Sequence, residues 1–337
     1  MIKEAINKII NNENLSFEET ECVMNEIMTG NATNAQIASF LTALRIKNET
    51  IDEITACATV MRKVGAHLEH NGDVLEIVGT GGDEAFTFNI SSVSSIVTAA
   101  AGVPTAKHGN RSVSSKCGAA DVFEELGVKL NITPQQNEKV LSETGLCFMF
   151  APVYHSSMKY AAPVRKEMGI RTIFNILGPL ANPASATIQL MGVYSEDLVE
   201  PMAQVLKNLG VQHGMVVYGQ DGIDEVSLVA KTTACEINND EIKKFEINPE
   251  DYGMSFCKKE DLTGGDAKEN ADIALNILKG EKGAKRDVVL LNSGIALYIA
   301  GKANNIAQGI ELAKETIDSG KAIKQLNKFI RVTNEVC

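Results

Sequence analysis

The chain lacks the cysteine pattern of a disulfide framework or a zinc site. Its seven cysteines are an odd number, and no two of them stand in a CxxC spacing, which disfavours both kinds of site. Histidine is scarce, with five in 337 residues, and no Ser/His/Asp arrangement or histidine-rich metal set is legible. We therefore expect reduced, mostly buried thiols, and chemistry by positioning and electrostatic stabilisation without a covalent nucleophile.

An excess of basic charge and long apolar runs are lacking as well. The formal net charge of −11 gives no overall attraction to nucleic acid or to an anionic membrane, so any anion site has to be a local basic cluster. No run approaches the ~18 apolar residues of a membrane-spanning helix, and the segment MIKEAINKII is too short and mixed for a signal peptide. We expect a cytoplasmic protein that binds neither nucleic acid nor membrane.

The length favours two domains, since 337 residues with 44% hydrophobic content exceed the size at which single cores usually stop growing. Residues 1–70 read as a small helical domain for packing or dimerisation, and helices from about 157–180 are expected to join it in space. Three capping boxes recur there every 17 residues: Ser16 with Glu19, Thr33 with Gln36, and Thr50 with Glu53.

Residues 71–337 read as an α/β domain with a mostly parallel central sheet, because short apolar strands alternate with helices. Strands are expected at 74–78, 103–107, 147–151, 187–193 and 214–218, and helices at 91–101, 119–126, 134–144, 158–168, 198–209, 270–280 and 304–329. Residues 236–260 read as a strand or hairpin, and 288–291 fit either a helix or a strand. Gly178, Pro179, Asn182 and Pro183 are expected to break the chain.

The segment GTGGDEAFTFNISS, residues 79–92, reads as a strand end, a glycine-rich turn and a helix start. Gly79, Gly81 and Gly82 carry no Cβ, so the backbone can adopt positive φ and approach a phosphate closely. The following helix adds roughly half a positive charge at its N-terminus. The spacing fits neither GxxxxGKS/T nor GxGxxG, so a phosphate site and a plain tight turn both remain open at this point.

A second cluster, KHGNRSVSS at residues 107–115, follows the next predicted strand. Its cations, its flexible Gly109 and its hydroxyls are what a loop that wraps a phosphate needs, although a solvated basic loop has the same composition. Neighbouring parallel strands end at the same sheet edge, so we expect this loop beside the glycine-rich turn.

Acidic and arginine side chains complete the candidate site. Asp224 and Glu225 follow another predicted strand and suit a hard cation such as Mg²⁺, which is commonly shared with substrate phosphates. An exposed acidic turn is the alternative. In PVRKEMGIRT, either Arg165 or Arg171 could hold a carboxylate in bidentate fashion, or could pair with a surface glutamate such as Glu167.

Several motifs in order resemble those of the anthranilate phosphoribosyltransferases: GTGGD, FNISS, KHGNRSVSSKCGAADVFEELG, APVRKEMGIRTIFNILGPLANP and DGIDEVS. The resemblance is collinear from the helical start to the C-terminus. It implies a fold of the nucleoside phosphorylase and phosphoribosyltransferase type. It also implies transfer of the phosphoribosyl group of phosphoribosyl pyrophosphate (PRPP) to the amine of anthranilate, in tryptophan biosynthesis. Mg²⁺, with two ions per site, and a homodimer joined through the helical domain follow from the same resemblance.

The resemblance further implies a role for individual residues. PRPP would be bound by Gly79, Gly82, Asp83, Thr87, Asn89, Ile90, Ser91, Ser92, Lys107, His108, Gly109, Asn110, Arg111, Ser112, Val113, Ser114, Ser115 and Ala119. Anthranilate would be bound by Gly79, Asn110 and Arg165, and the metal by Ser91, Asp224 and Glu225.

Two other functions compete with this interpretation. A pyrimidine nucleoside phosphorylase would share the fold class, but its phosphate loop differs from KHGNRSVSS and it would leave Asp224 and Glu225 without a purpose. A non-catalytic relative that binds nucleic acid or senses a phosphorylated metabolite is disfavoured by the acidic net charge and by the presence of Arg165 with the carboxylate pair.

Overall fold

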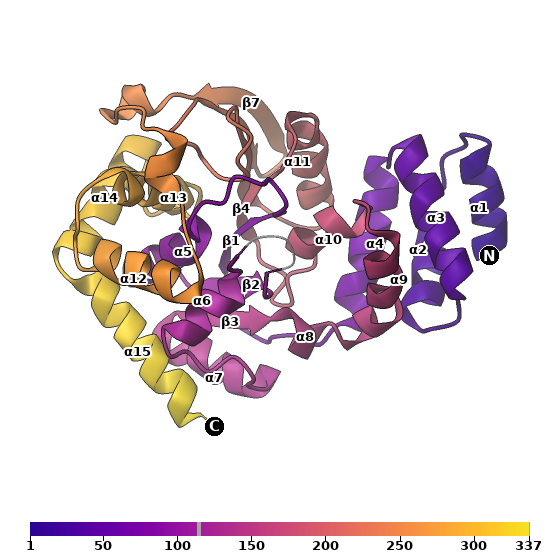
Figure 1. Cartoon of the computed structure of the whole chain (residues 1–337), viewed down its shortest axis with the longest axis horizontal. Helices are drawn as coiled ribbons and strands as arrows, with labels where there is room; N and C mark the ends of the chain where they lie inside the picture. The colour runs from indigo at the N-terminus through magenta and orange to yellow at the C-terminus, as the bar shows by residue number, and fades with distance from the viewer. Residues whose placement is uncertain (113–115, 337) are drawn as a thin grey trace.

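The computed structural model describes residues 1–112 and 116–336. The chain begins with four helices that form a small lobe (Figure 1): α1 (Ile2–Ile10), α2 (Phe17–Met28), α3 (Asn34–Lys47) and α4 (Ile51–Val64). The three predicted capping boxes are confirmed, since each N-cap side chain accepts from the N3 amide and each N3 side chain accepts from the N-cap amide. Local hydrogen bonding at the first turn therefore determines where α2, α3 and α4 begin.

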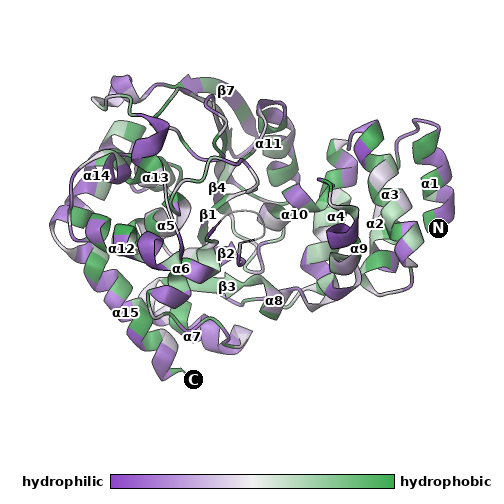
Figure 2. Cartoon of the chain, viewed as in Figure 1, coloured by the Kyte–Doolittle hydropathy of each residue, from purple (hydrophilic) through white to green (hydrophobic). Residues whose placement is uncertain are grey.

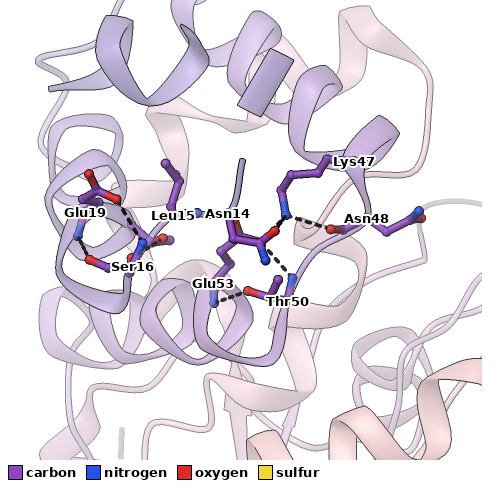
Figure 3. Close-up of polar contacts among 9 residues, drawn as sticks. Asn14, Leu15, Ser16, Glu19, Lys47, Asn48, Thr50 and Glu53 are labelled. Carbon is purple, nitrogen blue, oxygen red and sulfur yellow. Dashed lines mark hydrogen bonds and ion pairs between the residues drawn. The ribbon is translucent and has the colours of Figure 1, made fainter. Parts of the chain in front are cut away.

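One capping glutamate also ties the bundle together (Figure 3). Glu53 is fully buried, and its carboxylate accepts from the amides of Thr50, at 2.8 Å, and Leu15, at 3.0 Å. The ammonium of Lys47 lies 2.9 Å from the same carboxylate, with its side chain only 3% exposed. A buried carboxylate is tolerated when it is paired and hydrogen-bonded in this way, so Glu53 links three separate segments of the lobe.

The body of the molecule is a seven-stranded sheet in the order β3-β2-β1-β4-β5-β6-β7. Its first five strands in this order are parallel, and β6 and β7 form an antiparallel hairpin at one edge. The strand bounds are β1 (Leu75–Gly79), β2 (Thr105–Gly109), β3 (Leu146–Phe150), β4 (Ile188–Gly192), β5 (His213–Gly219), β6 (Thr232–Asn238) and β7 (Glu241–Ile247). The predicted strands are confirmed to within two residues at each end. A hairpin is present as predicted, but it spans 232–247, and residues 248–260 of the predicted range contain no strand.

Helices cover both faces of the sheet. Four of them connect or follow the parallel strands, namely α5 (Ile90–Ala100), α6 (Ala119–Glu125), α7 (Pro134–Thr144) and α11 (Val199–Asn208). The last helices, α12 (Ala267–Leu278), α13 (Ala284–Ile299), α14 (Ile306–Asp318) and α15 (Lys321–Glu335), pack around α5 on one side. Figure 2 shows apolar and polar residues alternating along α15, which buries Leu326, Phe329 and Val332.

Three predictions differ from the structure. Residues 158–168 are not one helix but η1 (Ser156–Tyr160) and α9 (Ala162–Met168), because Pro163 lacks an N–H and fits only the first turn of a new helix. The predicted helix 304–329 is interrupted between α14 and α15, where Gly320 has φ +74°. The predicted break over Gly178, Pro179, Asn182 and Pro183 is wrong for the first two, which lie in α10 (Phe174–Leu180), and is confirmed for Asn182 and Pro183, which follow the end of this helix.

Two buried clusters hold the chain together. One surrounds α5 and α13 on one face of the sheet. The other joins residues of the N-terminal lobe, such as Phe40, to Val164 of α9 and Leu177 of α10, and continues to Val216 on the other sheet face. The ambiguous residues 288–291 are helical and belong to the first cluster. Among residues 1–112 and 116–336, no helix is both long and apolar enough to span a membrane.

Candidate active site

The candidate site lies where four parallel strands end. The last residue of β1, β2, β4 and β5 is a glycine in each case: Gly79, Gly109, Gly192 and Gly219. In the register of the sheet, Gly79 stands opposite Gly192. The carboxyl ends of parallel strands are the usual ligand side of such sheets, and this edge brings the glycine-rich turn, the 107–112 segment and the 220–231 loop together.

Two of these glycines allow the acidic loop to pack onto the strand ends. A Cβ at Gly192 would lie 1.6 Å from the carbonyl oxygen of Asp224, and a Cβ at Gly79 would lie 2.3 Å from its Oδ2. The amide of Gly81 donates to the same Oδ2 at 2.5 Å. The strand-end glycines therefore act as contact surfaces for Asp224, because any side chain at these positions would collide with it.

The carboxylate pair combines a buried Asp224 with a partly exposed Glu225, and its ionised form is electrostatically unfavourable. Asp224 is 9% exposed, and burial followed by the negative charge of Asp83 raises its pKa to about 7. Burial and then the charge of Asp224 raise the pKa of Glu225 to about 8. A bound cation would offset both effects by favouring the ionised carboxylates.

The first turn of α5 faces this pair. The amide of Ser91 donates to Glu225 Oε1 at 3.1 Å, and the N-cap residue Asn89 provides no side-chain cap for the helix. The side chains of Ile90 and Ser92 are buried, so these residues can meet a ligand only through their main chain. An N-terminal turn without a side-chain cap presents amide donors to an anion.

Lys107 lies beneath this turn rather than on the surface. Its side chain is buried, and Nζ donates to the carbonyl of Ile77 at 2.7 Å and to Ser91 Oγ at 3.1 Å. Burial lowers its pKa, while the charge of Glu225 opposes that shift. Lys107 therefore contributes positive charge at the site and orients the Ser91 hydroxyl.

Arg111 and Ser112 of the basic loop are anchored to α6. Arg111 pairs with Asp121 at 2.9 Å and with Glu124 at 2.7 Å, and the amides of Ser112 and Gly118 donate to Asp121. The Arg111 guanidinium therefore has carboxylate partners in this structure. The predicted residues Val113, Ser114 and Ser115 lie outside the described residues.

Other predicted residues occupy the edges of the same region. Thr87 forms an isolated bridge with Thr263, and the side-chain amide of Asn89 donates to the carbonyl of Cys117. The carbonyl of Asn110 accepts from the amide of Ala120. Next to Asn110, a Cβ on Gly109 would lie 2.9 Å from the Phe148 ring and 3.3 Å from Ala119, so a side chain at this strand end would crowd both.

The two candidate arginines are placed differently. Arg165 stacks over Phe174 at 5.1 Å, and burial lowers its pKa without a carboxylate among its partners in the described chain. Arg171 donates to the carbonyl of Gly82 in the glycine-rich turn and lies 4.5 Å over the ring of Tyr194. Arg165 thus keeps its fork available for an anionic ligand, whereas Arg171 ties the glycine-rich turn to its surroundings.

One buried acid near the site was missed by sequence reasoning. Glu76 of β1 is fully buried, its Oε1 accepts from the amide of His108 at 3.3 Å, and burial raises its pKa to about 8. The signal was a single carboxylate within the apolar strand LEIVG. Within the described chain, no group of three or more His, Cys, Asp and Glu side chains forms a metal-binding cluster, so a cation would also need oxygens from a ligand.

Two family models match almost the whole chain. Residues 3–65 match the helical bundle domain of a glycosyl transferase family, and residues 71–323 match the α/β domain of such a family. The chain therefore belongs to a class of glycosyltransferases that combine a helical bundle with an α/β domain.

Individual relatives narrow this class. The anthranilate phosphoribosyltransferase of Ruminiclostridium cellulolyticum is 59% identical, over 99% of this chain and 98% of the relative. The crystal structure of the Thermus thermophilus anthranilate phosphoribosyltransferase has a TM-score of 0.93 at 40% identity, over 98% of this chain and 99% of that one. The Saccharomyces cerevisiae enzyme in complex with PRPP and Mg has a TM-score of 0.91 at 28% identity, over 99% and 98%. This chain belongs to the anthranilate phosphoribosyltransferase family.

Proposed function

We propose that the chain transfers the phosphoribosyl group of PRPP to the amine of anthranilate, giving N-(5-phosphoribosyl)anthranilate and pyrophosphate, as a step of tryptophan biosynthesis. Membership of the family supports this function. The observation in the structure that carries it is the carboxylate pair Asp224 and Glu225, which faces the glycine-rich turn and the first turn of α5. Two carboxylates in this position are typical of a site that binds Mg²⁺ together with the phosphates of a substrate.

The donor side of the proposed site consists of the segments that gather at the strand ends. The main-chain amides of the glycine-rich turn and of α5, together with the 107–115 loop and Ala119, would bind PRPP. Lys107, held under Ser91 by a hydrogen bond of 3.1 Å, would add a fixed positive charge near the departing pyrophosphate. Preorganised donors of this kind stabilise charge that develops in the transition state.

The residues present fit Mg²⁺, because Asp224 and Glu225 offer hard oxygen ligands whose ionised forms need a counter-charge. We propose that these two side chains, with Ser91, hold two ions together with the substrate phosphates. When bound, Mg²⁺ would neutralise the negative charge that collects on the leaving pyrophosphate.

The acceptor side is proposed to consist of Gly79, Asn110 and Arg165. The guanidinium of Arg165 stacks over Phe174 and would bind the carboxylate of anthranilate in bidentate fashion. The amine would then face C1 of the ribose. Its lone pair forms the new C–N bond as the C–O bond to pyrophosphate breaks, and the amine proton leaves to solvent, so the chain has only to orient the reactants and stabilise charge.

The organisation of the protein is part of the same proposal. We propose a helical domain of residues 1–70, joined by the helices of about 157–180, and an α/β domain of residues 71–337. The shared buried cluster of α4, α9 and α10 supports this division. We further propose a homodimer joined through the helical domain and a cytoplasmic location. The six cysteines of the described chain, none of which forms a disulfide, are consistent with a reducing compartment.

The comparisons do not favour the alternatives. The relatives named above match this chain over nearly their full length, and each is named anthranilate phosphoribosyltransferase. The function of a pyrimidine nucleoside phosphorylase would not explain the carboxylate pair. A non-catalytic relative would need no free arginine fork beside the donor site.

The deciding experiment follows the loss of anthranilate fluorescence with purified protein, PRPP and Mg²⁺. We expect decay that requires both PRPP and Mg²⁺, and no decay with aromatic amines that lack the carboxylate. In the Arg165→Gln variant we expect the KM for anthranilate to rise by about tenfold or more, since a charge-assisted hydrogen bond contributes roughly 1.5–3 kcal/mol, with the KM for PRPP little changed. Folded protein that shows no decay at saturating substrates would refute the function.

A further inference from the structure

The loop that carries Asp224 and Glu225 has no regular structure of its own. It connects β5, which ends at Gly219, to β6, which begins at Thr232. Asp224 is buried, its amide donates to Asp83 Oδ2 at 3.4 Å, and Glu225 follows it directly, so three carboxyl groups crowd one place and repel one another when ionised. Contacts from elsewhere in the fold therefore have to hold it in place.

The contact immediately after Glu225 comes from Asn292, a fully buried residue of α13. The side-chain Oδ1 of Asn292 accepts from the amide of Val226 at 3.1 Å. Its Nδ2 donates to the carbonyl of Val226 at 2.9 Å and to the carbonyl of Val288, one turn earlier in α13, at 2.9 Å. One side-chain amide thus satisfies both main-chain polar groups of the residue that follows Glu225.

The orientation of this amide is fixed by its partners. If oxygen and nitrogen were exchanged, Oδ1 would face two carbonyl oxygens and Nδ2 would face the N–H of Val226. Val226 is itself fully buried, so water cannot replace the bonds that Asn292 makes. Removing the amide leaves a buried donor and a buried acceptor unpaired, which favours movement of the loop away from α13.

On its other side the loop is limited by the strand ends. The absence of a Cβ at Gly79 and Gly192 lets Asp224 approach β1 and β4, and the amide of Gly81 donates to its carboxylate. The carboxylates therefore sit between a sheet edge that receives Asp224 and a helix that holds Val226.

We propose that Asn292 is a positioning residue for the cation-binding carboxylates, because it fixes the main chain directly after Glu225 through both polar groups of Val226. This inference rests on the proposed function, in which Asp224 and Glu225 hold Mg²⁺. Asn292 itself would touch neither substrate nor metal. Its effect would be to keep two mutually repelling carboxylates at the spacing that the cation requires.

The test compares Asn292→Ala with a matched control, Asn137→Ala. Asn137 is also buried, and its Nδ2 donates to the carbonyl of Phe148 at 2.8 Å and to the hydroxyl of Tyr154 at 3.0 Å, away from the acidic loop. Both variants lose a buried amide of the same kind, so both are expected to lose thermal stability. Only Asn292→Ala is expected to lose cation affinity.

The dissociation constant of Mn²⁺, used in place of Mg²⁺, is measured by electron paramagnetic resonance in the presence of PRPP. The Mg²⁺ concentration for half-maximal turnover is measured in parallel. For Asn292→Ala we expect both quantities to rise by about tenfold relative to Asn137→Ala, the ratio that corresponds to roughly 1.4 kcal/mol. If the two variants agree in both quantities to within about twofold, the positioning role is overturned.

Two further outcomes keep the test decisive. If Asn292→Ala does not fold, Asn292→Asp is read by the same criterion: it fills the same volume and keeps an acceptor for Val226, but it loses both donors. Because its added negative charge favours Mn²⁺ binding, a loss of affinity supports the role. If affinity is unchanged, Asn292→Leu, which has a similar volume, no charge and no polar group for Val226, decides: affinity equal to that of Asn137→Ala overturns the role. Wild-type protein that binds Mn²⁺ with PRPP but does not consume anthranilate would refute the proposed function and leave the role of Asn292 to the Mn²⁺ comparison.

Discussion

Replacing His155 with glutamine tests whether a buried imidazole near the junction of the lobe and the sheet makes the fold sensitive to acid. His155 is 5% exposed, its ring lies edge-on to that of His108 at 5.0 Å, and a Cβ on Gly65, at the end of α4, would lie 3.1 Å from its Nδ1. Burial lowers the pKa of His155 from 6.5 to about 4. A proton that binds to His155 therefore binds more tightly to the unfolded chain than to the folded one.

The sign and size of the effect follow from this difference. Above pH 6.5 the imidazole is neutral in both states and its contribution to stability is complete. As the pH falls from 6.5 towards 4, the unfolded chain takes up the proton first, and stability is lost at up to 1.36 kcal/mol per pH unit. Between pH 7 and pH 5 this amounts to about 2 kcal/mol from His155 alone.

The measurement is urea unfolding at pH 7 and pH 5, followed by far-ultraviolet circular dichroism because the chain contains no tryptophan. We expect the free energy of unfolding of His155→Gln to fall by about 2 kcal/mol less than that of the wild type between these two pH values. His67→Gln, at an exposed position, is the control and is expected to follow the wild type. If His155→Gln loses as much stability on acidification as the wild type does, the assignment of a low pKa to this buried ring is wrong.

Three other predictions test separate parts of the structure. Asp224→Asn combined with Glu225→Gln is expected to lower Mg²⁺-dependent turnover by about 100-fold or more without loss of folding, and circular dichroism together with the fluorescence assay decides this. Arg171→Ala removes the hydrogen bond to the glycine-rich turn and is expected to raise the KM for PRPP by about tenfold. Tyr194→Phe keeps the ring under the guanidinium and should leave this KM unchanged. Equal effects of the two substitutions would contradict the role of Arg171. Glu53→Ala leaves the buried ammonium of Lys47 without its carboxylate partner and is expected to cost about 3 kcal/mol of stability. An unfolding midpoint equal to that of the wild type would count against the network in Figure 3.

Much of the fold could be predicted because it depends on short-range patterns. The serine and threonine caps at Ser16, Thr33 and Thr50 are satisfied within one turn of helix, so the structure has them where the spacing indicates. The apolar strands and their terminal glycines are equally local, which is why the sequence placed the glycine-rich turn and Asp224 at the same sheet edge. The errors arose where helix boundaries depend on more than periodicity, at Pro163, at Pro179 and at Gly320.

The sequence by itself therefore determined the order of helices and strands, the glycine-rich turn and the candidate carboxylates, because neighbouring residues suffice to fix them. Only the tertiary structure decided which groups meet. It placed Lys107 under Ser91 and buried Glu76 beside His108. It gave Arg165 the ring of Phe174 as its partner and Arg171 the carbonyl of Gly82. It also brought Asn292 to Val226. Burial and hydrogen bonding between residues far apart in the chain set these contacts, and the pattern of neighbouring residues does not specify them.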